Sequence, residues 1–371
     1  MTIRPTRMVV SLDNYRYNYR AIRDYVSGSK VIAVVKANAY GIGAIPAVWA
    51  LKAEGADFFA VGTPDEAVEL REAGVLDSLL VLGASPYEAA GIYVRLGVSA
   101  TITDLPMAEA MSRAAVRLGA PARVHLKVDS GMGRLGFLPD ASLRAAEEIS
   151  GMPGVELEGV LTHFASSDEE DLSHTWRQFM TFSSVVRSIK DAGIAVPIAH
   201  CSNSGSIMAG LSEMFMDAVR PGHILSGVIP TPECRDGVRI KPCFEVKTAI
   251  AAIRDLPPGS GVSYGLTYTT RETERIAILP VGYGDGYSRV LSNAGHVLIG
   301  GKRCPVRGRV CMDQCVADIS RVQNAKVGDE AVLVGRQGGE AITMEEMAEL
   351  LSVNAASVPL SFTARIPREY I

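Results

Sequence analysis

The chain has 371 residues, a hydrophobic fraction of 47%, a charged fraction of 21% and a formal net charge of −4. Its length predicts two domains, its composition is that of a globular enzyme, and its slight acidity argues against a nucleic-acid partner. Residues 1–20 contain no apolar core for a signal peptide, and no later run could span a bilayer, so we expect a cytoplasmic protein without membrane segments.

The cysteines stand at positions 201, 234, 243, 304, 311 and 315 and form no C-x-x-C pair. This scattered spacing argues against a zinc site and against a disulfide scaffold. We therefore expect reduced thiols and no metal.

Short β-like runs alternate with helical stretches over residues 1–235. We predict strands at 31–35, 58–62, 79–83, 98–102, 123–129, 157–164, 198–202 and around 218–225. Stretches such as 64–74 and 106–119 carry apolar residues at helical spacing and end at glycine. Eight such repeats predict an α/β fold of the (β/α)8 barrel type. A doubly wound sheet is disfavoured, because no G-x-G-x-x-G follows the first strand.

The pattern changes after about residue 235. Helical spacing fades, and short β-rich runs are separated by turn pairs, which predicts a mainly β second domain over residues 236–371. One helix is predicted at 343–354, where Thr343 and Glu346 have the spacing of a capping box.

Lys36 is the most informative single residue. It follows the first predicted strand directly and precedes a turn that ends at Gly41. A lone lysine is commonly a solvated surface charge. At the mouth of a barrel it could instead be desolvated, which lowers its pKa and allows it to form a Schiff base.

Polar residues gather at the carboxyl ends of the predicted strands, where barrels of this type carry their active sites. They are Lys36, Lys127, Arg134, His163, His200 and Arg220. Taken singly, His163 could be a hydrogen-bonded core histidine and Arg134 the partner of a surface acid. Donors in 202–206 and in the turn 220–222 could hold a phosphate. A lysine beside a phosphate-binding loop indicates pyridoxal phosphate.

Eight motifs resemble, in order, those of alanine racemases: VVKANAYG, HLKVDSGMGRLG, LTHFASSDE, NS at 203–204, VRPG, VSYGLTY, GYGDGYSR and RGRVCMDQ. The resemblance implies a pyridoxal-phosphate-binding barrel and a β-rich domain that pairs with roughly the first ten residues. It also implies a homodimer with shared active sites. The reaction would be the interconversion of L-alanine and D-alanine, which supplies D-alanine for peptidoglycan precursors.

The resemblance assigns the two acid/base groups to Lys36 and Tyr264, the latter from the partner subunit. A tyrosine with a pKa near ~10 needs a positive neighbour or a hydrogen-bond network to act as a base. His163 would bond Arg220, and Arg220 would face the ring nitrogen of the cofactor. Because arginine keeps its proton, this contact would limit side reactions such as transamination.

The resemblance also implies the rest of the site. Arg134 would contact the cofactor and the substrate carboxylate, and Lys127, a possible carbamylation site, would orient Arg134. Met312 of the partner would meet the substrate carboxylate. Further cofactor contacts would come from Tyr40, Asn203, Ser204 and Gly222, and the substrate entrance from Asp168, Tyr283, Arg289 and Arg309.

Ala355 departs from the family pattern, because a tyrosine usually stands there. The change could be drift compensated by neighbours, or it could widen the pocket for serine or longer side chains. Two other classes are alternatives. A non-enzymatic pyridoxal-phosphate carrier would lack the second domain, and a barrel-type decarboxylase would need a cysteine and an aspartate, which Cys311 and Asp313 superficially offer.

Overall fold

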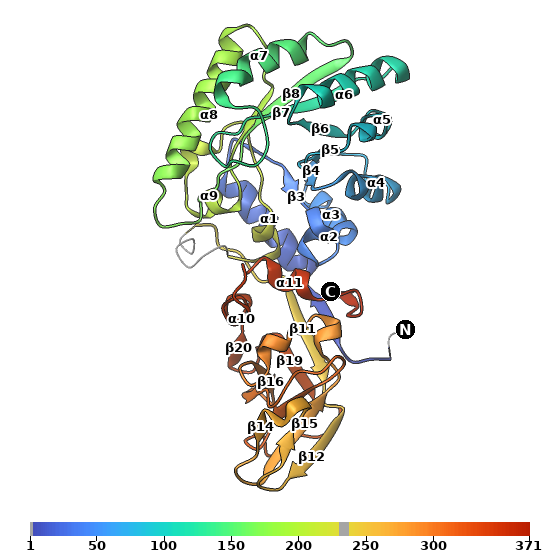
Figure 1. The fold of residues 1–371 in the computed structure, drawn as a ribbon, viewed down its shortest axis with the longest axis vertical. Helices are drawn as coiled ribbons and strands as arrows, with labels where there is room; N and C mark the ends of the chain where they lie inside the picture. Colours follow the sequence, from blue (N-terminus) through green and yellow to red (C-terminus); the bar gives the residue numbers. More distant parts are fainter. Residues whose placement is uncertain (1–2, 230–236) are drawn as a thin grey trace. The chain divides into compact units, whose positions relative to one another are not determined.

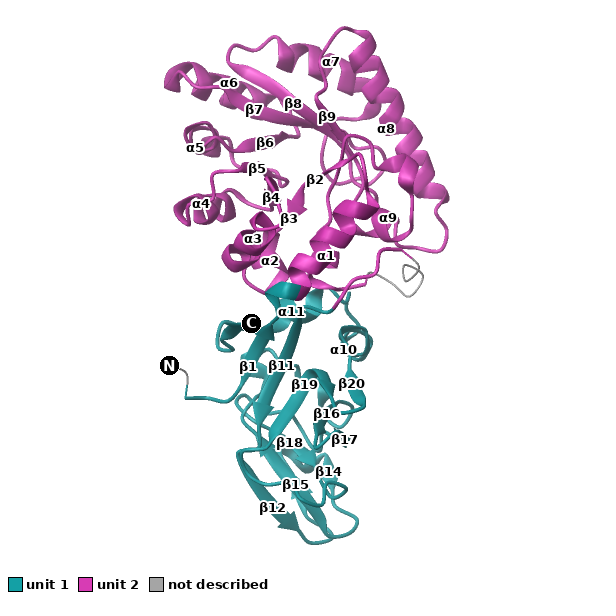
Figure 2. Cartoon of the chain, turned by 180° about the vertical axis from the view of Figure 1, so that it is seen from behind, with its two compact units in different colours: residues 1–13, 242–371 teal, residues 14–241 magenta. Residues whose placement is uncertain are grey.

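The computed structural model describes residues 3–229 and 237–371 (Figure 1). They form two compact units, a barrel unit of residues 14–241 and a β-rich unit of residues 1–13 and 242–371 (Figure 2). Cys234 and the domain boundary predicted after residue 235 lie outside the described residues. None of the described helices combines the length and the apolarity that crossing a bilayer requires.

The barrel unit is built on a parallel sheet with the order β2-β10-β9-β8-β7-β6-β5-β4-β3. Its strands are β2 (Lys30–Val31), β3 (Ala33–Val34), β4 (Phe58–Val61), β5 (Ser78–Val81), β6 (Ser99–Ile102), β7 (Ala122–Lys127), β8 (Val155–Leu161), β9 (Ile198–His200) and β10 (Ala218–Val219). Only Ile32 separates β2 from β3, so the two edges of the sheet are one stretch of chain. The sheet therefore closes, which confirms the predicted (β/α)8 barrel.

Helices lie between the strands and cover the outside of the sheet (Figure 1). The helical segments of this unit are α1 (Leu12–Tyr25), α2 (Lys36–Tyr40), α3 (Ala44–Lys52), α4 (Pro64–Glu72), α5 (Ala90–Leu96), α6 (Leu105–Leu118), α7 (Pro139–Ser150), α8 (Ser173–Asp191) and α9 (Ser204–Met208), of which α2 is a short left-handed turn at the rim. Inside the barrel, Ile32, Phe58, Leu80, Ile198 and Ala218 form an apolar cluster contributed by strands that lie far apart in the sequence.

The eighth strand is shorter than the sequence predicted. β10 ends at Val219, and the chain turns into a short 3₁₀ segment at His223–Ser226. Pro221 explains the difference, because proline has no N–H to donate to a neighbouring strand. The early end of β10 leaves Arg220 and Gly222 at the rim.

The described residues of the β-rich unit form three sheets, whose strands follow the orders β17-β16-β19-β11-β1-β21, β12-β15-β18 and β13-β14, with β20 paired to β19. The strands are β1 (Arg7–Val10), β11 (Phe244–Ala249), β12 (Ala252–Leu256), β13 (Gly261–Val262), β14 (Tyr268–Thr269), β15 (Glu274–Leu279), β16 (His296–Ile299), β17 (Lys302–Pro305), β18 (Cys315–Asp318), β19 (Glu330–Gln337), β20 (Glu340–Ile342) and β21 (Arg368–Tyr370). Two helices, α10 (Met344–Leu351) and α11 (Ser357–Ser361), complete it. Thr343 caps α10 by accepting the N–H of Glu346 at 3.1 Å.

Candidate active site

Lys36 lies at the end of β3, where the backbone enters a left-handed turn. Ala37, Asn38, Ala39 and Tyr40 have φ angles of 51°, 54°, 51° and 56°. Left-handed backbone is unfavourable for residues other than glycine, at about 1–2 kcal/mol for each. The turn therefore needs support from its surroundings, and the neighbouring elements supply it.

Glu66 on α4 provides the nearest support. Its carboxylate accepts the N–H of Ala37 through one oxygen and the N–H of Gly62, at 2.7 Å, through the other. On the far side of the turn, Asn38 accepts the N–H of Ala44 at 2.7 Å. The backbone on both sides of Lys36 is thereby fixed, so the direction of its side chain at the rim is fixed as well.

The Lys36 amine is tuned by its position. The side chain is open to solvent at the rim, yet protein atoms surround enough of it that partial burial lowers its pKa. The positive charge of Arg134, and more weakly that of Arg220, lowers the pKa further, while Glu66 acts in the opposite direction. This environment favours the neutral amine, which is the nucleophilic form.

The structure brings together three residues predicted to contact the cofactor phosphate. The Ser204 hydroxyl accepts the N–H of Gly222 at 2.9 Å. A Cβ atom at Gly222 would lie 2.2 Å from the Tyr40 hydroxyl, so only glycine permits this approach. Beside them, Nε2 of His223 is buried with no hydrogen-bond partner among the described residues, and the rings of His223 and Tyr40 are 6.1 Å apart.

Asn203 and Asp168 lie next to this group. The side-chain oxygen of Asn203 accepts the N–H of Ser206 at 3.0 Å and the Ser167 hydroxyl at 2.7 Å. Asn203 therefore caps α9, and its bond to Ser167 joins the loop after β8 to the start of that helix. Asp168 in that loop lies close to Gly205, where an added Cβ would stand 3.1 Å from the Asp168 Cβ.

Arg220 is buried, with 3% of its surface exposed, and its guanidinium is held on several sides. It donates to the carbonyls of Thr162 at 2.7 Å and Cys201 at 3.0 Å, and to Nδ1 of His163 at 3.3 Å. Burial lowers the pKa of Arg220 to about 10, so it is still charged at neutral pH. Burial and the charge of Arg220 hold the pKa of His163 well below its usual range, so His163 is neutral and accepts the bond.

Lys127 and Arg134 flank this cluster. Burial, then the charges of Arg220 and Arg134, lowers the pKa of Lys127 well below its usual range. Arg134 follows a loop organised by Asp129, whose carboxylate accepts the N–H groups of residues 131–134 at 2.9–3.1 Å. Partial burial opposes the charge on Asp129, but these backbone bonds outweigh it and lower the pKa. Asp129 thus positions Arg134.

Tyr264 and Met312 lie together in the β-rich unit. An open cavity of about 390 Å³ is lined by Ser263, Tyr264, Cys311, Met312, Asp313 and Gln314. The Ser263 hydroxyl donates to the carbonyl of Arg309 at 2.6 Å, which joins the two loops that form the cavity. Tyr264 is 68% exposed and Met312 is 52% exposed. Lys36 and Tyr264 belong to different units, so their pairing stays a prediction.

The predicted entrance residues of this unit are connected to the same loops. The N–H of Tyr283 donates to the carbonyl of Cys311 at 3.0 Å. A Cβ at Gly265 would lie 3.1 Å from the Arg309 guanidinium, so Arg309 packs against the Tyr264 turn. Arg289 begins a short 3₁₀ turn that ends at Leu291, next to Ser292, whose hydroxyl accepts the N–H of Val310 at 3.0 Å.

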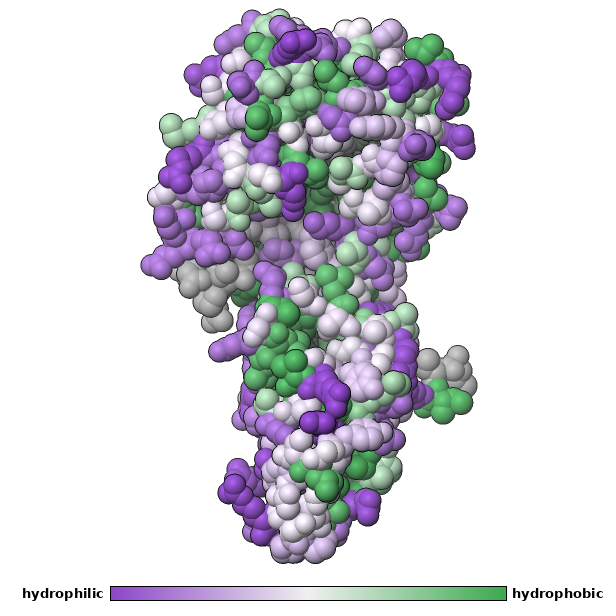
Figure 3. All heavy atoms as spheres, viewed as in Figure 1, coloured by the Kyte–Doolittle hydropathy of each residue, from purple (hydrophilic) through white to green (hydrophobic). Residues whose placement is uncertain are grey.

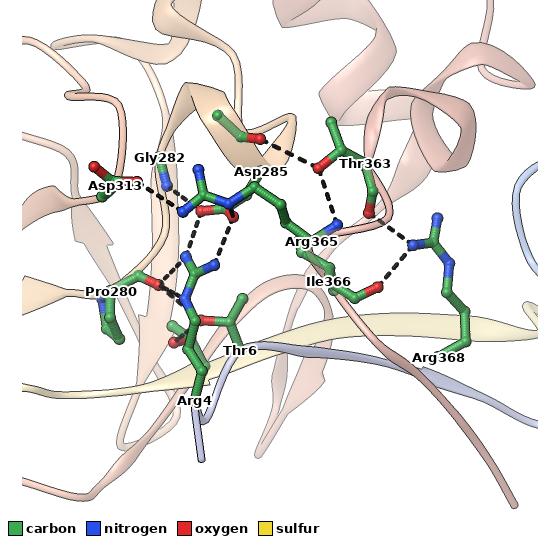
Figure 4. A network of polar contacts seen from close by, with 12 residues as sticks. Arg4, Thr6, Pro280, Gly282, Asp285, Asp313, Thr363, Arg365, Ile366 and Arg368 are labelled. Carbon is green, nitrogen blue, oxygen red and sulfur yellow. Dashed lines mark hydrogen bonds and ion pairs between the residues drawn. The ribbon is translucent and has the colours of Figure 1, made fainter. Parts of the chain in front are cut away.

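A buried carboxylate at the centre of a network of polar contacts supports these loops (Figure 4). Asp285 is fully buried and pairs with Arg4 through both of its oxygens, one of them 2.6 Å from Nη1. It also accepts the N–H of Gly282 at 3.0 Å and lies 3.4 Å from Arg365. Arg365 in turn pairs with Asp313 at 2.7 Å. The N-terminus, the Tyr283 turn, the Met312 loop and the C-terminal segment are thereby linked.

Three supporting acids were missed by the sequence reasoning: Glu66, Asp129 and Asp285. Asp129 precedes Ser-Gly, and Asp285 lies between glycines, which are ordinary turn signals that could have found them. Glu66 had a clearer signal, because it stands three residues after Thr63 and completes a capping box. Ala355 is 6% exposed and lies between α10 and α11.

Comparisons with known proteins cover both units. Residues 10–230 match the N-terminal domain of alanine racemases, and residues 243–370 match the C-terminal domain. Alanine racemase 2 of Caldanaerobacter subterraneus subsp. tengcongensis is 40% identical over 371 residues, covering 100% of this chain and 95% of its own. The alanine racemase of Clostridium perfringens is 40% identical over 370 residues, covering 99% and 96%.

A solved structure of the alanine racemase from Clostridium difficile 630 has a TM-score of 0.95 and 35% identity, covering 100% of this chain and 97% of that one. The match to both domain types also disfavours a carrier that consists of the barrel alone. The chain therefore belongs to the alanine racemase family of amino-acid racemases.

Proposed function

We propose that this enzyme interconverts L-alanine and D-alanine in the cytoplasm, with pyridoxal 5'-phosphate held at Lys36 and with Lys36 and Tyr264 as the two bases. The observation that carries the proposal is the rim of the barrel unit. There a lysine of lowered pKa lies within the electrostatic reach of Arg134 and Arg220, and Gly222 lets the Tyr40 hydroxyl approach the backbone closely. The broader range of amino acids suggested by Ala355 is not favoured, because the full-length relatives are alanine racemases.

The residues at this rim fit the cofactor. The lowered pKa of Lys36 increases its share of neutral amine, the form that attaches to an aldehyde. The Tyr40 and Ser204 hydroxyls lie at Gly222, next to His223, whose Nε2 has no hydrogen-bond partner among the described residues. These polar groups are suited to a phosphate. When bound, pyridoxal phosphate withdraws electrons from the α-carbon of an amino acid and so acidifies its α-proton.

The chain's own residues would then move and restrain protons. The Lys36 amine holds a proton at Nζ on one face of the substrate, and the Tyr264 phenol holds one on the other face. Two bases on opposite faces allow removal and return of the α-proton with inversion. Arg220 keeps its proton, because its pKa of about 10 lies far above neutral pH, and so it does not protonate a ring nitrogen.

Lys127 is suited to carbamylation. Its lowered pKa favours a neutral amine that can add to carbon dioxide with release of a proton to solvent, and the resulting anion would lie within the electrostatic reach of Arg220 and Arg134. Such a charge would hold Arg134 in place for the substrate carboxylate.

The proposal requires a homodimer, in which Tyr264 and Met312 of one subunit complete the site of the other. Figure 3 shows residues of high hydropathy gathered on the visible face of the β-rich unit. Separately from that view, Tyr264, Leu266, Val290 and Met312 are all more than half exposed in the chain alone. Exposed apolar side chains of this kind suit an interface between subunits.

Incubation of the purified enzyme with L-alanine in D2O, with added pyridoxal phosphate, tests the function. We expect α-deuterium in alanine and an equal final mixture of D and L forms. Release of CO2 would instead indicate a decarboxylase. Deuterium incorporation without inversion would contradict the two-base arrangement, and parallel assays with L-serine and L-lysine measure specificity.

A further inference from the structure

A continuous line of hydrogen bonds crosses the interior of the barrel from Arg220 to Glu158. Nη1 of Arg220 lies 2.9 Å from Nδ1 of His200, and Nε2 of His200 lies 2.8 Å from Nδ1 of His125. Nε2 of His125 lies 2.9 Å from Oε2 of Glu158, which also accepts the Ser99 hydroxyl at 2.5 Å. Both histidines are fully buried.

The chemistry of the two ends fixes the direction of every bond. A guanidinium only donates, so Nδ1 of His200 must accept and its proton must be on Nε2. Nε2 of His200 then donates to Nδ1 of His125, and Nε2 of His125 donates to Glu158. Burial and the charge of Arg220 hold the pKa of His200 well below its usual range, in agreement with a neutral ring.

A β-bulge between β7 and β8 makes room for this line of hydrogen bonds. The pairing of β7 with β8 passes from Val124 opposite Leu157 to His125 opposite Gly159, so Glu158 is the extra residue of a β-bulge. Bulges redirect side chains, and this one accompanies a Glu158 side chain that reaches His125 and Ser99 on neighbouring strands. A Cβ at Gly159 would lie 2.4 Å from Nδ1 of His125, so any other residue would displace the histidine.

Arg220 needs such a connection, because a buried charge is costly unless it is compensated. Among the described residues, no carboxylate forms a direct ion pair with Arg220. Glu158 is the charged group at the other end of the line, and its side chain is 21% exposed. Burial opposes its negative charge, but the hydrogen bonds from His125 and Ser99 outweigh burial and lower the pKa of Glu158.

We propose that Glu158 is the remote counterion of Arg220, joined to it by two neutral histidines, and that it acts as a positioning residue for the reaction. No proton moves along the line. The carboxylate instead polarises the three hydrogen bonds in one direction and so holds the guanidinium in its place and in its charged state. The catalytic consequence rests on the proposed function, in which Arg220 faces the cofactor.

The charge of the two histidines and the position of their ring protons test the line of hydrogen bonds in the wild-type protein. The chain has 6 histidines, so nitrogen NMR of the histidine-labelled, cofactor-loaded enzyme gives few signals. We expect His125 and His200 both to be neutral with the proton on Nε2. A proton on Nδ1 of either ring, or a charged ring, would overturn the proposal, whether or not the enzyme racemises alanine.

Kinetics test the positioning role. Glu158→Gln keeps the shape of the side chain but removes its charge. We expect kcat to fall about tenfold with KM changed by less than about twofold, which is the size of effect seen for outer-shell hydrogen-bond partners of residues that bind a group directly. Glu158→Asp should recover part of the loss. In Glu158→Gln, the NMR signal of the His125 proton should also lose the downfield shift that a charged acceptor causes.

Glu156→Gln is the matched control, because Glu156 lies on the same strand and pairs with Arg123 at 3.7 Å on the surface. It should leave kcat unchanged. Equal effects of the Glu156 and Glu158 variants, or full kcat in Glu158→Gln, would refute the positioning role. If Glu158→Gln does not fold, Ser99→Ala removes the second anchor of the carboxylate and should lower kcat to a smaller degree. An inactive wild-type enzyme with the expected histidine states would refute the proposed function alone.

Discussion

The two units differ in how they carry their site residues. In the barrel unit, Lys36 is open at the rim, but Arg220 and Lys127 are only 3% and 8% exposed, and backbone carbonyls hold the Arg220 guanidinium in place. In the β-rich unit, Tyr264 and Met312 are 68% and 52% exposed, although the buried Asp285 supports the neighbouring loops through hydrogen bonds. The barrel unit therefore contains a site organised by its own chain, whereas the β-rich unit presents one that is organised but uncovered.

Removing the Lys36 amine of the barrel unit should have the largest effect on activity. We expect Lys36→Met to lower racemisation by at least about 10³-fold, since acid–base groups commonly contribute 10²–10⁴-fold. Assay of D-alanine formed from L-alanine measures this loss. Activity within tenfold of wild type would show that the barrel rim is not the reactive centre.

The same variant has an opposite effect on stability. Because folding lowers the pKa of Lys36, the unfolded chain binds this proton more tightly, and the charge destabilises the cofactor-free fold below pH ~10.4. Lys36→Met should therefore be more stable than wild type in urea unfolding at pH 7. The difference should shrink as the pH rises through the lowered pKa towards 10.4, and a less stable variant at pH 7 would contradict this account.

Tyr264→Phe tests the uncovered site of the β-rich unit. We expect a loss of about 10²–10³-fold, because the phenol would no longer exchange a proton on its face of the substrate. Since Tyr264 is exposed, its loss should leave the free energy of unfolding within about 0.5 kcal/mol of wild type. A large loss of stability would mean that Tyr264 has a structural role instead.

Mixing two inactive variants sharpens the comparison between the units. If sites are shared between subunits, a dimer of Lys36→Met with Tyr264→Phe has one site with both changes and one site with neither. Random reassociation should then restore about a quarter of the wild-type activity. Each variant reassociated alone is the control, and no recovery in mixtures proven to contain heterodimers would exclude shared sites.

Glu66→Gln should have an intermediate effect. The variant loses the charge that holds the N–H groups of Ala37 and Gly62, so we expect kcat to fall about tenfold and stability to fall by about 1.5–3 kcal/mol. Glu69→Gln is the matched control, because Glu69 is exposed on the same helix. Similar losses in both variants would indicate an effect on α4 rather than on the turn at Lys36.

Of these variants, Asp285→Asn should have the smallest effect on activity, but it should clearly lower the stability. We expect a loss of about 2 kcal/mol at pH 7 and only a few-fold fall in kcat/KM. Burial opposes the charge of Asp285, but Arg4 outweighs it and lowers the pKa, so this stabilisation is present above pH ~3.9 and is lost as the pH falls through the lowered pKa. Urea unfolding at pH 7 and pH 3 measures it, with Glu109→Gln at the exposed Arg113 pair as control. A difference that persists unchanged at pH 3 would contradict this cause.

The sequence was sufficient to predict the barrel, because strands and helices alternate with clear apolar runs. It also singled out Lys36, Tyr40, Ser204 and Gly222, which the structure brings to one rim, although their roles there stay predictions. It could not predict Glu158, His125 or the bulge that joins them. A one-residue change of register leaves no mark in composition or periodicity, and a histidine inside a strand looks like any other polar interruption.

The left-handed turn after Lys36 has a consequence for how the protein folds. Ala37, Ala39 and Tyr40 together cost on the order of 3–6 kcal/mol, which is comparable with the whole net stability of a typical domain. The turn depends on α4, whose Glu66 accepts the N–H of Ala37, so we expect it to form only after α4 has packed. Until then the direction of the Lys36 side chain is not fixed, and the rim is assembled only as the barrel around it is completed.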